Sequence, residues 1–429
     1  MNIVIVNQPL GNRGDESAHK GLIRALLKNL PKVNIKVLFV SVPQDSIDQF
    51  AVDNQQVEYI NLLNRESSNT LVSKCKPLRF LYSRWKKWIY QHFHKVAIQS
   101  LQTGNYSLWD TQPIVQKIKS YYTNADLILC APGGICMGGF QNWYHLFFLK
   151  LAQKMNKPLA YYGRSFGPFP TETELNRKFK ALSLELLHYF TFISIRDKKT
   201  ETLAQELSVN YIPTLDSAFL DTPKIDLPSA AKTLLGETPY MVFVPNLLTW
   251  HYAYSSVPRK TILSFYNQLI DCIIERFPNY RIVMLPQTFN SASSNDILLF
   301  KEIADVRKDT RLVVMPDCYS SDIQQRIIRE AAFVVGARYH SIVFSINQAV
   351  PFIALSYEHK ITGLLQTLGK DDCMIDISQI FADENLIRKA IESFKDMLPK
   401  LKSDVQAQAE AKQKADTCFQ LFIKKYSNL

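Results

Sequence analysis

Val334-Val335-Gly336-Ala337-Arg338-Tyr339-His340-Ser341 is the stretch that best indicates the fold of this chain. Its apolar start is typical of a buried strand, its glycine of a turn, and residues 341–346 of a helix. In α/β proteins, ligands bind where such strands end. Arg338 offers a planar fork for a carboxylate or phosphate, and His340 can donate to a phosphate oxygen or move a proton. The alternative is a strand end with an exposed arginine and a histidine satisfied by its neighbours.

Short β-branched runs alternate with longer helical patterns on both sides of this stretch. The predicted strands are 2–7, 35–42, 126–130, 158–163 and 191–195 in the first half, and 240–245, 280–285, 312–315, 332–336 and 351–355 in the second. The predicted helices are 15–29, 141–155, 173–189, 198–207, 259–277, 322–330, 341–348 and 360–368. This alternation predicts parallel sheets that are covered by helices on both faces.

A length of 429 residues exceeds what one ordinary hydrophobic core supports, so two domains are expected. A charged, proline-containing segment without periodicity at 221–239 is typical of a linker. We therefore predict an α/β fold with two Rossmann-like domains, residues 1–225 on the acceptor side and 240–380 on the donor side, whose parallel sheets face a central cleft. A helical segment, residues 383–429, follows them.

Composition is that of a soluble globular protein, with 47% hydrophobic and 21% charged residues. No apolar run approaches the length of a membrane span, and the first residues are typical of a buried strand rather than a signal peptide. Seven scattered cysteines without CxxC spacing indicate free thiols in a reducing cytoplasm. The net charge of +11 fits an anionic substrate, a membrane surface or nucleic acid, and selects none of them.

Several kinds of site lack support in the sequence. The eight histidines include one close pair, His92 and His94, without partnered carboxylates, so no metal site is predicted. The GxSxG elbow of α/β hydrolases is absent. The first predicted strand leads into Gly11-Asn12-Arg13-Gly14-Asp15, which has neither Walker nor dinucleotide-binding spacing. Asp15 in this turn fits a catalytic carboxylate or only a helix cap.

Three further loops follow predicted strands of the first half. One contains glycines at positions 133, 134, 138 and 139, which let a ligand approach the backbone closely. A second is Gly163-Arg164-Ser165-Phe166-Gly167-Pro168, and Arg196 ends another strand. Because the carboxyl ends of parallel strands meet at one edge, these loops and the first glycine turn predict one wall of an anion-binding cleft.

Residues 74–109 differ from the surrounding pattern. Aromatic and aliphatic residues alternate there with seven basic ones, namely Lys74, Lys76, Arg79, Arg84, Lys86, Lys87 and Lys95. A helix from about residue 78 gives an amphipathic surface that suits an anionic membrane interface. The alternative is an ordinary helix with its aromatics on the core and its lysines in water. Nucleic acid is a weaker match, because no recognition module accompanies the patch.

Nine short motifs occur in a fixed order over residues 2–370. They are Gly11-Asn12-Arg13-Gly14-Asp15, the Pro-Gly-Gly of 132–134, Gly167-Pro168, Arg196-Asp197, Asp216-Ser217-Ala218-Phe219, Pro286-Gln287, Gly336-x-Arg338-x-His340, Val350-Pro351 and Tyr357-x-x-Lys360. Together they resemble the polysaccharide pyruvyl transferase family. Each motif alone has little specificity, but nine in order are specific.

The resemblance implies a GT-B-like pair of Rossmann-like domains and a transfer of the pyruvyl group of phosphoenolpyruvate to a sugar. The product is a cyclic ketal on two hydroxyls, phosphate leaves, and no metal or other cofactor is required. Arg338 and His340 match the family's phosphoenolpyruvate-binding Arg-x-His, and Arg196 is the matching arginine of the other domain. Arg164 stands where many relatives carry glutamine. Capsule and other surface polysaccharides are commonly assembled on lipid carriers, so a lipid-linked acceptor at the inner membrane face is implied.

Ketal formation needs a general acid, a general base and positive charge near the leaving group. His340 can hold the phosphate and donate a proton, while Asp15 or Asp216 can deprotonate the sugar hydroxyl. Lys360 either neutralises the carboxylate of phosphoenolpyruvate or is solvated at a helix start. The predicted substrate-binding residues are Arg338, Arg196, Arg164, Lys360, Gly133, Gly134 and Asn12.

Two other functions fit the same residues. A GT-B glycosyltransferase with a nucleotide-sugar donor would grip a diphosphate with Arg338 and His340, with Tyr357 and Glu358 near the sugar or base. A non-catalytic glycan-binding relative would keep the fold alone. The glycine loops and the Arg338/His340 pair argue against the second, because such glycines cost conformational entropy.

Overall fold

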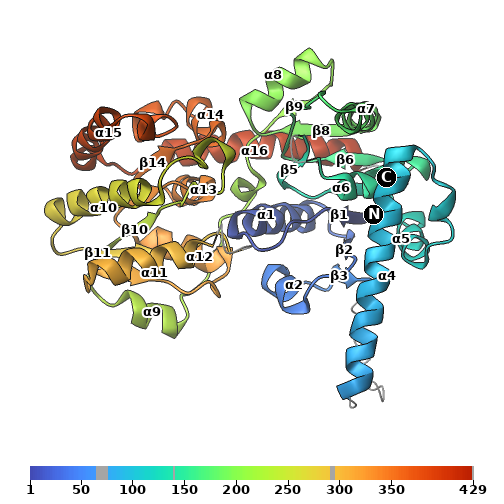
Figure 1. The fold of residues 1–429 in the computed structure, drawn as a ribbon, viewed down its shortest axis with the longest axis horizontal. Coiled ribbons are helices and arrows are strands. Elements are labelled where there is room, and N and C mark those ends of the chain that lie inside the picture. Colours follow the sequence, from blue (N-terminus) through green and yellow to red (C-terminus); the bar gives the residue numbers. More distant parts are fainter. Residues whose placement is uncertain (64–75, 139–140, 290–294, 428–429) are drawn as a thin grey trace. The chain divides into compact units, whose positions relative to one another are not determined.

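The computed structural model describes residues 1–63, 76–138, 141–289 and 295–427 (Figure 1). The chain forms two compact units. The first unit contains Met1–Leu10, Leu22–Thr214 and Cys418–Leu429, and the second contains Gly11–Gly21 and Leu215–Thr417. This division differs from the predicted one in placing the start of the first long helix in the second unit. The predicted linker, moreover, contains helix α9 (Ser229–Leu235).

The described part of the first unit contains a parallel sheet with the strand order β3-β2-β1-β4-β6-β8-β9. Its strands are β1 (Asn2–Val6), β2 (Asn34–Phe39), β3 (Val57–Asn61), β4 (Leu127–Cys130), β6 (Leu159–Tyr161), β8 (Phe192–Ile195) and β9 (Ile212–Pro213). All four residues of β4 are buried, as expected for a strand covered on both faces. Two predicted loops instead pair as a small sheet, β5 (Gly133–Met137) with β7 (Arg164–Phe166).

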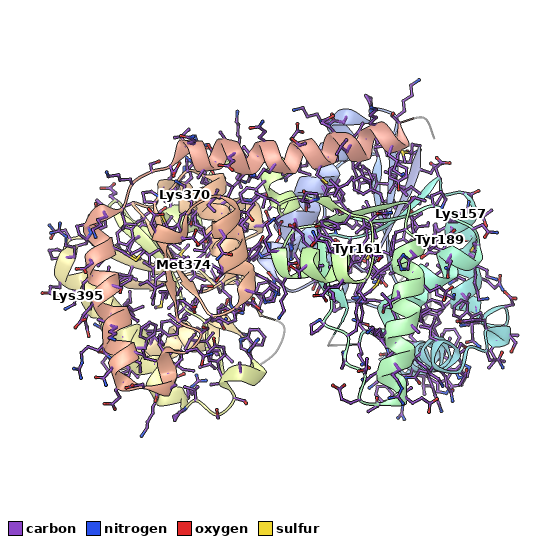
Figure 2. All side chains as sticks on the ribbon, turned by 90° about the horizontal axis from the view of Figure 1, so that it is seen from above. Lys157, Tyr161, Tyr189, Lys370, Met374 and Lys395 are labelled. Carbon is purple, nitrogen blue, oxygen red and sulfur yellow. The ribbon has the colours of Figure 1, made fainter. Side chains whose placement is uncertain are left out.

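Helices accompany this sheet in the first unit, which takes the part of α1 from Leu22 onward. They are α1 (Arg13–Asn29), α2 (Gln44–Phe50), α4 (Lys76–Thr103), α5 (Pro113–Thr123), α6 (Trp143–Lys154), α7 (Glu174–Tyr189) and α8 (Lys198–Glu206), with a short 3-10 helix η1 (Ser107–Trp109). Phe93 of α4 lies against Phe147 of α6, with ring centroids 5.3 Å apart. At the end of α7, the Tyr189 hydroxyl donates to the carbonyl oxygen of Lys157 at 3.1 Å (Figure 2).

The second unit contains, within its described residues, a parallel sheet with the order β12-β11-β10-β13-β14-β15. Its strands are β10 (Tyr240–Val244), β11 (Arg281–Met284), β12 (Leu312–Val314), β13 (Val334–Gly336), β14 (Phe352–Ser356) and β15 (Met374–Asp376). The helices are α9, α10 (Arg259–Arg276), α11 (Asp296–Arg307), α12 (Ser321–Glu330), α13 (Tyr339–Asn347), α14 (His359–Thr367), α15 (Glu384–Met397) and most of α16 (Val405–Tyr426), with 3-10 turns η2 (Ser217–Leu220), η3 (Tyr252–Tyr254), η4 (Asp371–Cys373), η5 (Ile380–Ala382) and η6 (Leu398–Lys400). Lys370 forms an ion pair with Asp404, the residue before α16 (Figure 2).

The two parallel α/β sheets confirm the predicted fold class. Each of the ten predicted strands has a counterpart, from β1 to β14. Sequence patterns missed the short edge strands β3, β9 and β15, and the helices α2, α5, α9 and α11. Over the described ranges, no helix combines the length and apolar character needed to cross a membrane.

Candidate active site

The candidate site lies at the carboxyl edge of the sheet of the second unit, where β13 ends and α13 begins. The predicted strand, turn and helix are present, and the helix begins at Tyr339, two residues earlier than expected. A side chain at Gly336 would place its Cβ atom 2.0 Å from Ser341 Oγ, so only glycine lets the chain turn this closely. The turn brings Arg338 and His340 to the edge of the sheet.

Arg338 is buried and paired with Asp296, the first residue of α11. Its Nε lies 3.2 Å from Asp296 Oδ1, and its Nη2 also contacts that oxygen. Burial lowers the pKa of the Arg338 guanidinium, but Asp296 together with Tyr357 and Tyr266 raises it, and the net pKa is raised. Nη1 makes no hydrogen bond with any residue that the structure describes, so one edge of the guanidinium can still meet an anion.

Asp296 is a residue that the sequence patterns did not identify. Its second oxygen, Oδ2, accepts hydrogen bonds from the backbone N–H groups of Gln287 and Thr288, both at 2.9 Å. These residues follow β11, whereas Arg338 follows β13. The buried carboxylate of Asp296 therefore connects the loop after β11 with the guanidinium of Arg338 after β13. A hydrophilic residue at a helix start is ordinary for a cap, so its longer-range role left no signal in the sequence.

His340 is oriented by Asp216, a second predicted site residue. His340 Nε2 lies 3.3 Å from Asp216 Oδ2, and Asp216 Oδ1 accepts the N–H of Ala218 at 3.0 Å. Asp216 is fully buried. Because it is fully buried, Asp216 is well placed to orient the imidazole, and its role as a base stays a prediction.

The first turn of α1 lies against His340 and belongs to the same unit. A Cβ atom at Gly14 would come within 1.8 Å of His340 Nδ1, so the helix approaches the ring closely at this glycine. Asn12 Oδ1 accepts the N–H of Gly14 at 2.7 Å and stabilises the turn. Asp15 is buried and makes no hydrogen bond or ion pair with any described residue. Asn12 and Asp15 are thus close in sequence to Gly14, the residue that approaches His340.

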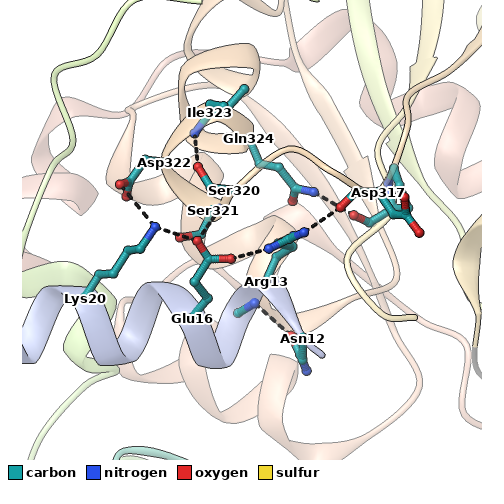
Figure 3. A network of polar contacts seen from close by, with 12 residues as sticks. Asn12, Arg13, Glu16, Lys20, Asp317, Ser320, Ser321, Asp322, Ile323 and Gln324 are labelled. Carbon is teal, nitrogen blue, oxygen red and sulfur yellow. Dashed lines mark hydrogen bonds and ion pairs between the residues drawn. The ribbon is translucent and has the colours of Figure 1, made fainter. Parts of the chain in front are cut away.

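A buried ion network holds this turn in place (Figure 3). Glu16 Oε2 lies 2.7 Å from Arg13 Nη1, and Glu16 Oε1 lies 2.7 Å from Lys20 Nζ. The backbone N–H of Ser321 also donates to Glu16 Oε1, at 3.0 Å, and Arg13 donates to the carbonyl oxygen of Asp317 at 2.5 Å. Breaking such a buried pair costs about 3–5 kcal/mol. Arg13 and Glu16 therefore stabilise the position of the predicted glycine turn at residues 11–15.

Lys360 lies in the first turn of α14 and keeps part of its side chain accessible. Its Nζ is 3.7 Å from Glu358 Oε1. Burial and then the Glu358 carboxylate raise the pKa of Tyr357 well above its ordinary value. Tyr357 therefore stays neutral beside Arg338, and Lys360 supplies a partly accessible cation at the start of α14.

The remaining predicted residues belong to the first unit, which is described by itself. Arg164 is buried and donates to the carbonyl oxygens of Gly134 at 2.9 Å, Ala131 at 2.7 Å and Asn7 at 3.3 Å. Its guanidinium therefore holds the segment around Gly133 together, and its role as a substrate ligand stays a prediction.

Arg196 follows β8 in the first unit and is largely buried. The next residue, Asp197, caps α8 by accepting the N–H of Thr200 at 2.9 Å and also accepts the hydroxyl of Ser165 at 2.5 Å. The structure thus brings together Arg338, His340, Asp216 and the Asn12–Asp15 turn in one unit, and places Arg196, Gly133 and Gly134 in the other.

Comparison with known proteins found a matching family model and a curated relative. The model of the polysaccharide pyruvyl transferase family matches residues 12–359. The chain is 24% identical over 413 residues, 91% of each protein, to the amylovoran biosynthesis protein AmsJ of Erwinia amylovora.

Solved structures share the fold of the chain. A UDP-GlcNAc 2-epimerase from Neisseria meningitidis, bound to UDP-GlcNAc, has a TM-score of 0.55 at 10% identity and covers 99% of this chain and 100% of its own. HepE from Anabaena, in complex with UDP and glucose, has a TM-score of 0.52 at 12% identity and covers 100% of both chains. At this level of identity the likeness concerns the fold alone.

Proposed function

The chain belongs to the polysaccharide pyruvyl transferase family, and we propose that it transfers the pyruvyl group of phosphoenolpyruvate to a sugar of a surface polysaccharide or of its lipid-linked precursor. The observation that carries the proposal is the pair of oriented side chains at the end of β13. Arg338 is fixed by Asp296 and His340 by Asp216, so both are preorganised before a substrate arrives.

Phosphoenolpyruvate carries a carboxylate and a phosphate, which the site can bind separately. The Nη1 edge of Arg338 meets one anionic group, and Lys360 meets the other. The first backbone N–H groups of α13, next to Arg338, add partial positive charge at the same edge. No resident metal or organic cofactor is part of this proposal.

The reaction forms two C–O bonds to the central carbon of phosphoenolpyruvate and breaks its bond to the phosphate oxygen. A proton adds to the methylene carbon, which becomes a methyl group, and one sugar hydroxyl attacks the central carbon. The second hydroxyl then displaces phosphate, which carries away the remaining proton. His340, oriented through Nε2, is the proposed proton donor to phosphate, and Asp15 is the proposed base for a hydroxyl.

Phosphate release from phosphoenolpyruvate in the presence of sugar acceptors tests the proposal. His340→Ala is expected to lower turnover by about 10²–10⁴-fold, the usual contribution of a general acid or base. His188→Ala, which removes an exposed histidine in the last turn of α7, is the matched control and should leave turnover unchanged. Equal turnover in wild type and His340→Ala would remove His340 from the mechanism.

A lipid-linked acceptor would place the protein at the inner face of the cell membrane, and helix α4 offers a surface for this contact. Its 28 residues include no aspartate or glutamate. Phe80, Leu81, Trp85 and Trp88 are 53–62% exposed. The first half of α4 extends beyond the other helices of its unit (Figure 1). Exposed aromatics beside Arg84, Lys86 and Lys87 are typical of a helix that inserts its apolar side among anionic headgroups. Residues 74 and 75, the first two of the predicted basic aromatic segment, lie outside the residues that the structure describes.

Co-sedimentation with phosphatidylglycerol-containing vesicles tests this contact. The wild type is expected to bind these vesicles more strongly than pure phosphatidylcholine vesicles, because the surface is basic. Neutralising Arg84, Lys86 and Lys87 should abolish the difference, whereas neutralising the exposed pair Lys424 and Lys425 should not. Co-sedimentation that does not respond to the α4 changes would count against the membrane contact.

A further inference from the structure

The loop after β10 carries an aromatic side chain that the proposed chemistry does not use. Trp250 is 37% exposed, although a large indole is normally buried. Its ring lies 5.9 Å from the guanidinium carbon of Arg338. We propose that Trp250 is the platform on which the acceptor sugar stacks while its hydroxyls approach phosphoenolpyruvate. This inference rests on the proposed function.

The indole of Trp250 is held by its polar edge. Its Nε1 donates to Asn246 Oδ1 at 2.9 Å, and the same oxygen accepts the N–H of Leu248 at 3.3 Å. Asn246 is fully buried, and its backbone N–H donates to the hydroxyl of Tyr266 at 3.1 Å. The orientation of the indole is therefore fixed from within the unit, and its exposed area is not needed for this attachment.

The same loop is fastened to the segment after β14. The Tyr254 hydroxyl donates to the carbonyl oxygen of Tyr357 at 2.7 Å, and the rings of Trp250 and Tyr357 are 6.4 Å apart. The ring of His251 lies 6.1 Å from that of Tyr357. The loops that follow β10, β13 and β14 thus meet around Arg338. The indole of Trp250 provides a large apolar surface among them.

The polar groups around the indole suit a neutral, hydroxyl-bearing ligand. Burial lowers the pKa of His251, with Glu358 raising it and Lys360 lowering it, so the imidazole is neutral at neutral pH. A neutral imidazole and the Glu358 carboxylate are good partners for sugar hydroxyls. The apolar face of a pyranose ring matches an indole, and a few polar groups around an aromatic surface are typical of small-molecule sites. Phosphoenolpyruvate, small and highly charged, gains little from such a surface.

Two variants separate the stacking surface from the donor site. Trp250→Leu removes the aromatic face, and Trp250→Phe keeps part of it. We expect Trp250→Leu to weaken sugar binding by about tenfold, corresponding to about 1.4 kcal/mol, and Trp250→Phe to weaken it less. The dissociation constant of phosphoenolpyruvate should stay within about twofold in both. Leu175→Ala, at an exposed apolar residue of α7, is the control.

The probes are methyl glycosides of galactose, glucose and N-acetylmannosamine, each with phosphoenolpyruvate present. Saturation-transfer NMR from the protein's aromatic protons reports sugar binding, and calorimetry reports phosphoenolpyruvate binding.

Sugar signals that fall in Trp250→Leu and recover in Trp250→Phe support the platform. Unchanged sugar signals in Trp250→Leu, or no sugar binding by the wild type, would overturn it. So would UDP binding that depends on Trp250, since the indole would then hold a nucleobase. Failure of phosphoenolpyruvate to bind the wild type would instead refute the proposed function.

Discussion

Replacing Asp296 with asparagine tests the role of this unpredicted carboxylate. Asp296 faces Arg338 with one oxygen and two backbone N–H groups with the other. An asparagine oxygen that accepts the two N–H groups turns its NH₂ group toward the Arg338 donors. The flipped amide instead leaves the two N–H groups without an acceptor. In either orientation a buried positive charge loses its partner, and we expect the free energy of unfolding to fall by about 3–5 kcal/mol.

Urea denaturation of the two proteins, followed by tryptophan fluorescence, measures this change. The matched control is Asp271→Asn, because Asp271 also pairs with an arginine, Arg307, but is 64% exposed at its side chain. That exposed pair is expected to contribute less than about 1 kcal/mol. Phosphoenolpyruvate should stabilise Asp296→Asn more than it stabilises the wild type, because the ligand supplies negative charge to an unpaired Arg338.

The double variant Asp296→Asn with Arg338→Met separates charge from packing. Replacing a buried ion pair by neutral groups of similar size is often nearly neutral for stability, so much of the loss should be recovered. A loss for Asp296→Asn as small as that for Asp271→Asn would refute the reasoning, since it would mean that the Arg338 charge is compensated by solvent.

Three further results are expected. Gly14→Ala should lower turnover strongly, with a smaller effect on folding, because the added Cβ would lie 1.8 Å from His340 Nδ1. Reduced turnover with a normal melting temperature would show this effect. Full activity would contradict it. Burial, and then Lys20, lower the pKa of His19 to about 3 from its ordinary value of 6.5, so this neutral histidine stabilises the fold fully above about pH 6.5 and progressively less as the pH falls towards 3. Urea midpoints from about pH 7 to pH 4 should fall less steeply in His19→Leu, and an unchanged slope would exclude this origin. Arg164→Ala should destabilise the protein by several kcal/mol, because contacts with the backbone are lost. Calorimetry at a temperature where the variant is folded should show an unchanged affinity for phosphoenolpyruvate.

Much of the fold could be predicted because parallel strands buried on both faces are near-continuous apolar runs. β4 and β10, for example, are buried at every residue. Edge strands and short amphipathic helices escaped prediction because their residues are partly exposed and carry weaker periodicity. β3 has only two buried residues, and β9 is only two residues long.

The candidate site was predictable only where local motifs carry it. Arg338, His340 and Asp216 were predicted, but the partner of Arg338 lies 42 residues away and no spacing rule connects the two. The backbone contacts of Arg164 were not predicted, for a related reason. An arginine in a glycine-rich loop resembles an anion ligand, whereas the carbonyl oxygens that it holds come from three separate backbone positions.

The most direct test of the central claim is calorimetric titration of the protein with phosphoenolpyruvate and, separately, with UDP. The wild type should bind phosphoenolpyruvate and give no heat with UDP. Arg338→Lys, which keeps a charge beside Asp296 but lacks the planar fork, should bind phosphoenolpyruvate at least about tenfold more weakly, and Arg276→Lys on the exposed end of α10 should bind normally. Binding of UDP without binding of phosphoenolpyruvate, or equal phosphoenolpyruvate affinity in wild type and Arg338→Lys, would contradict the account.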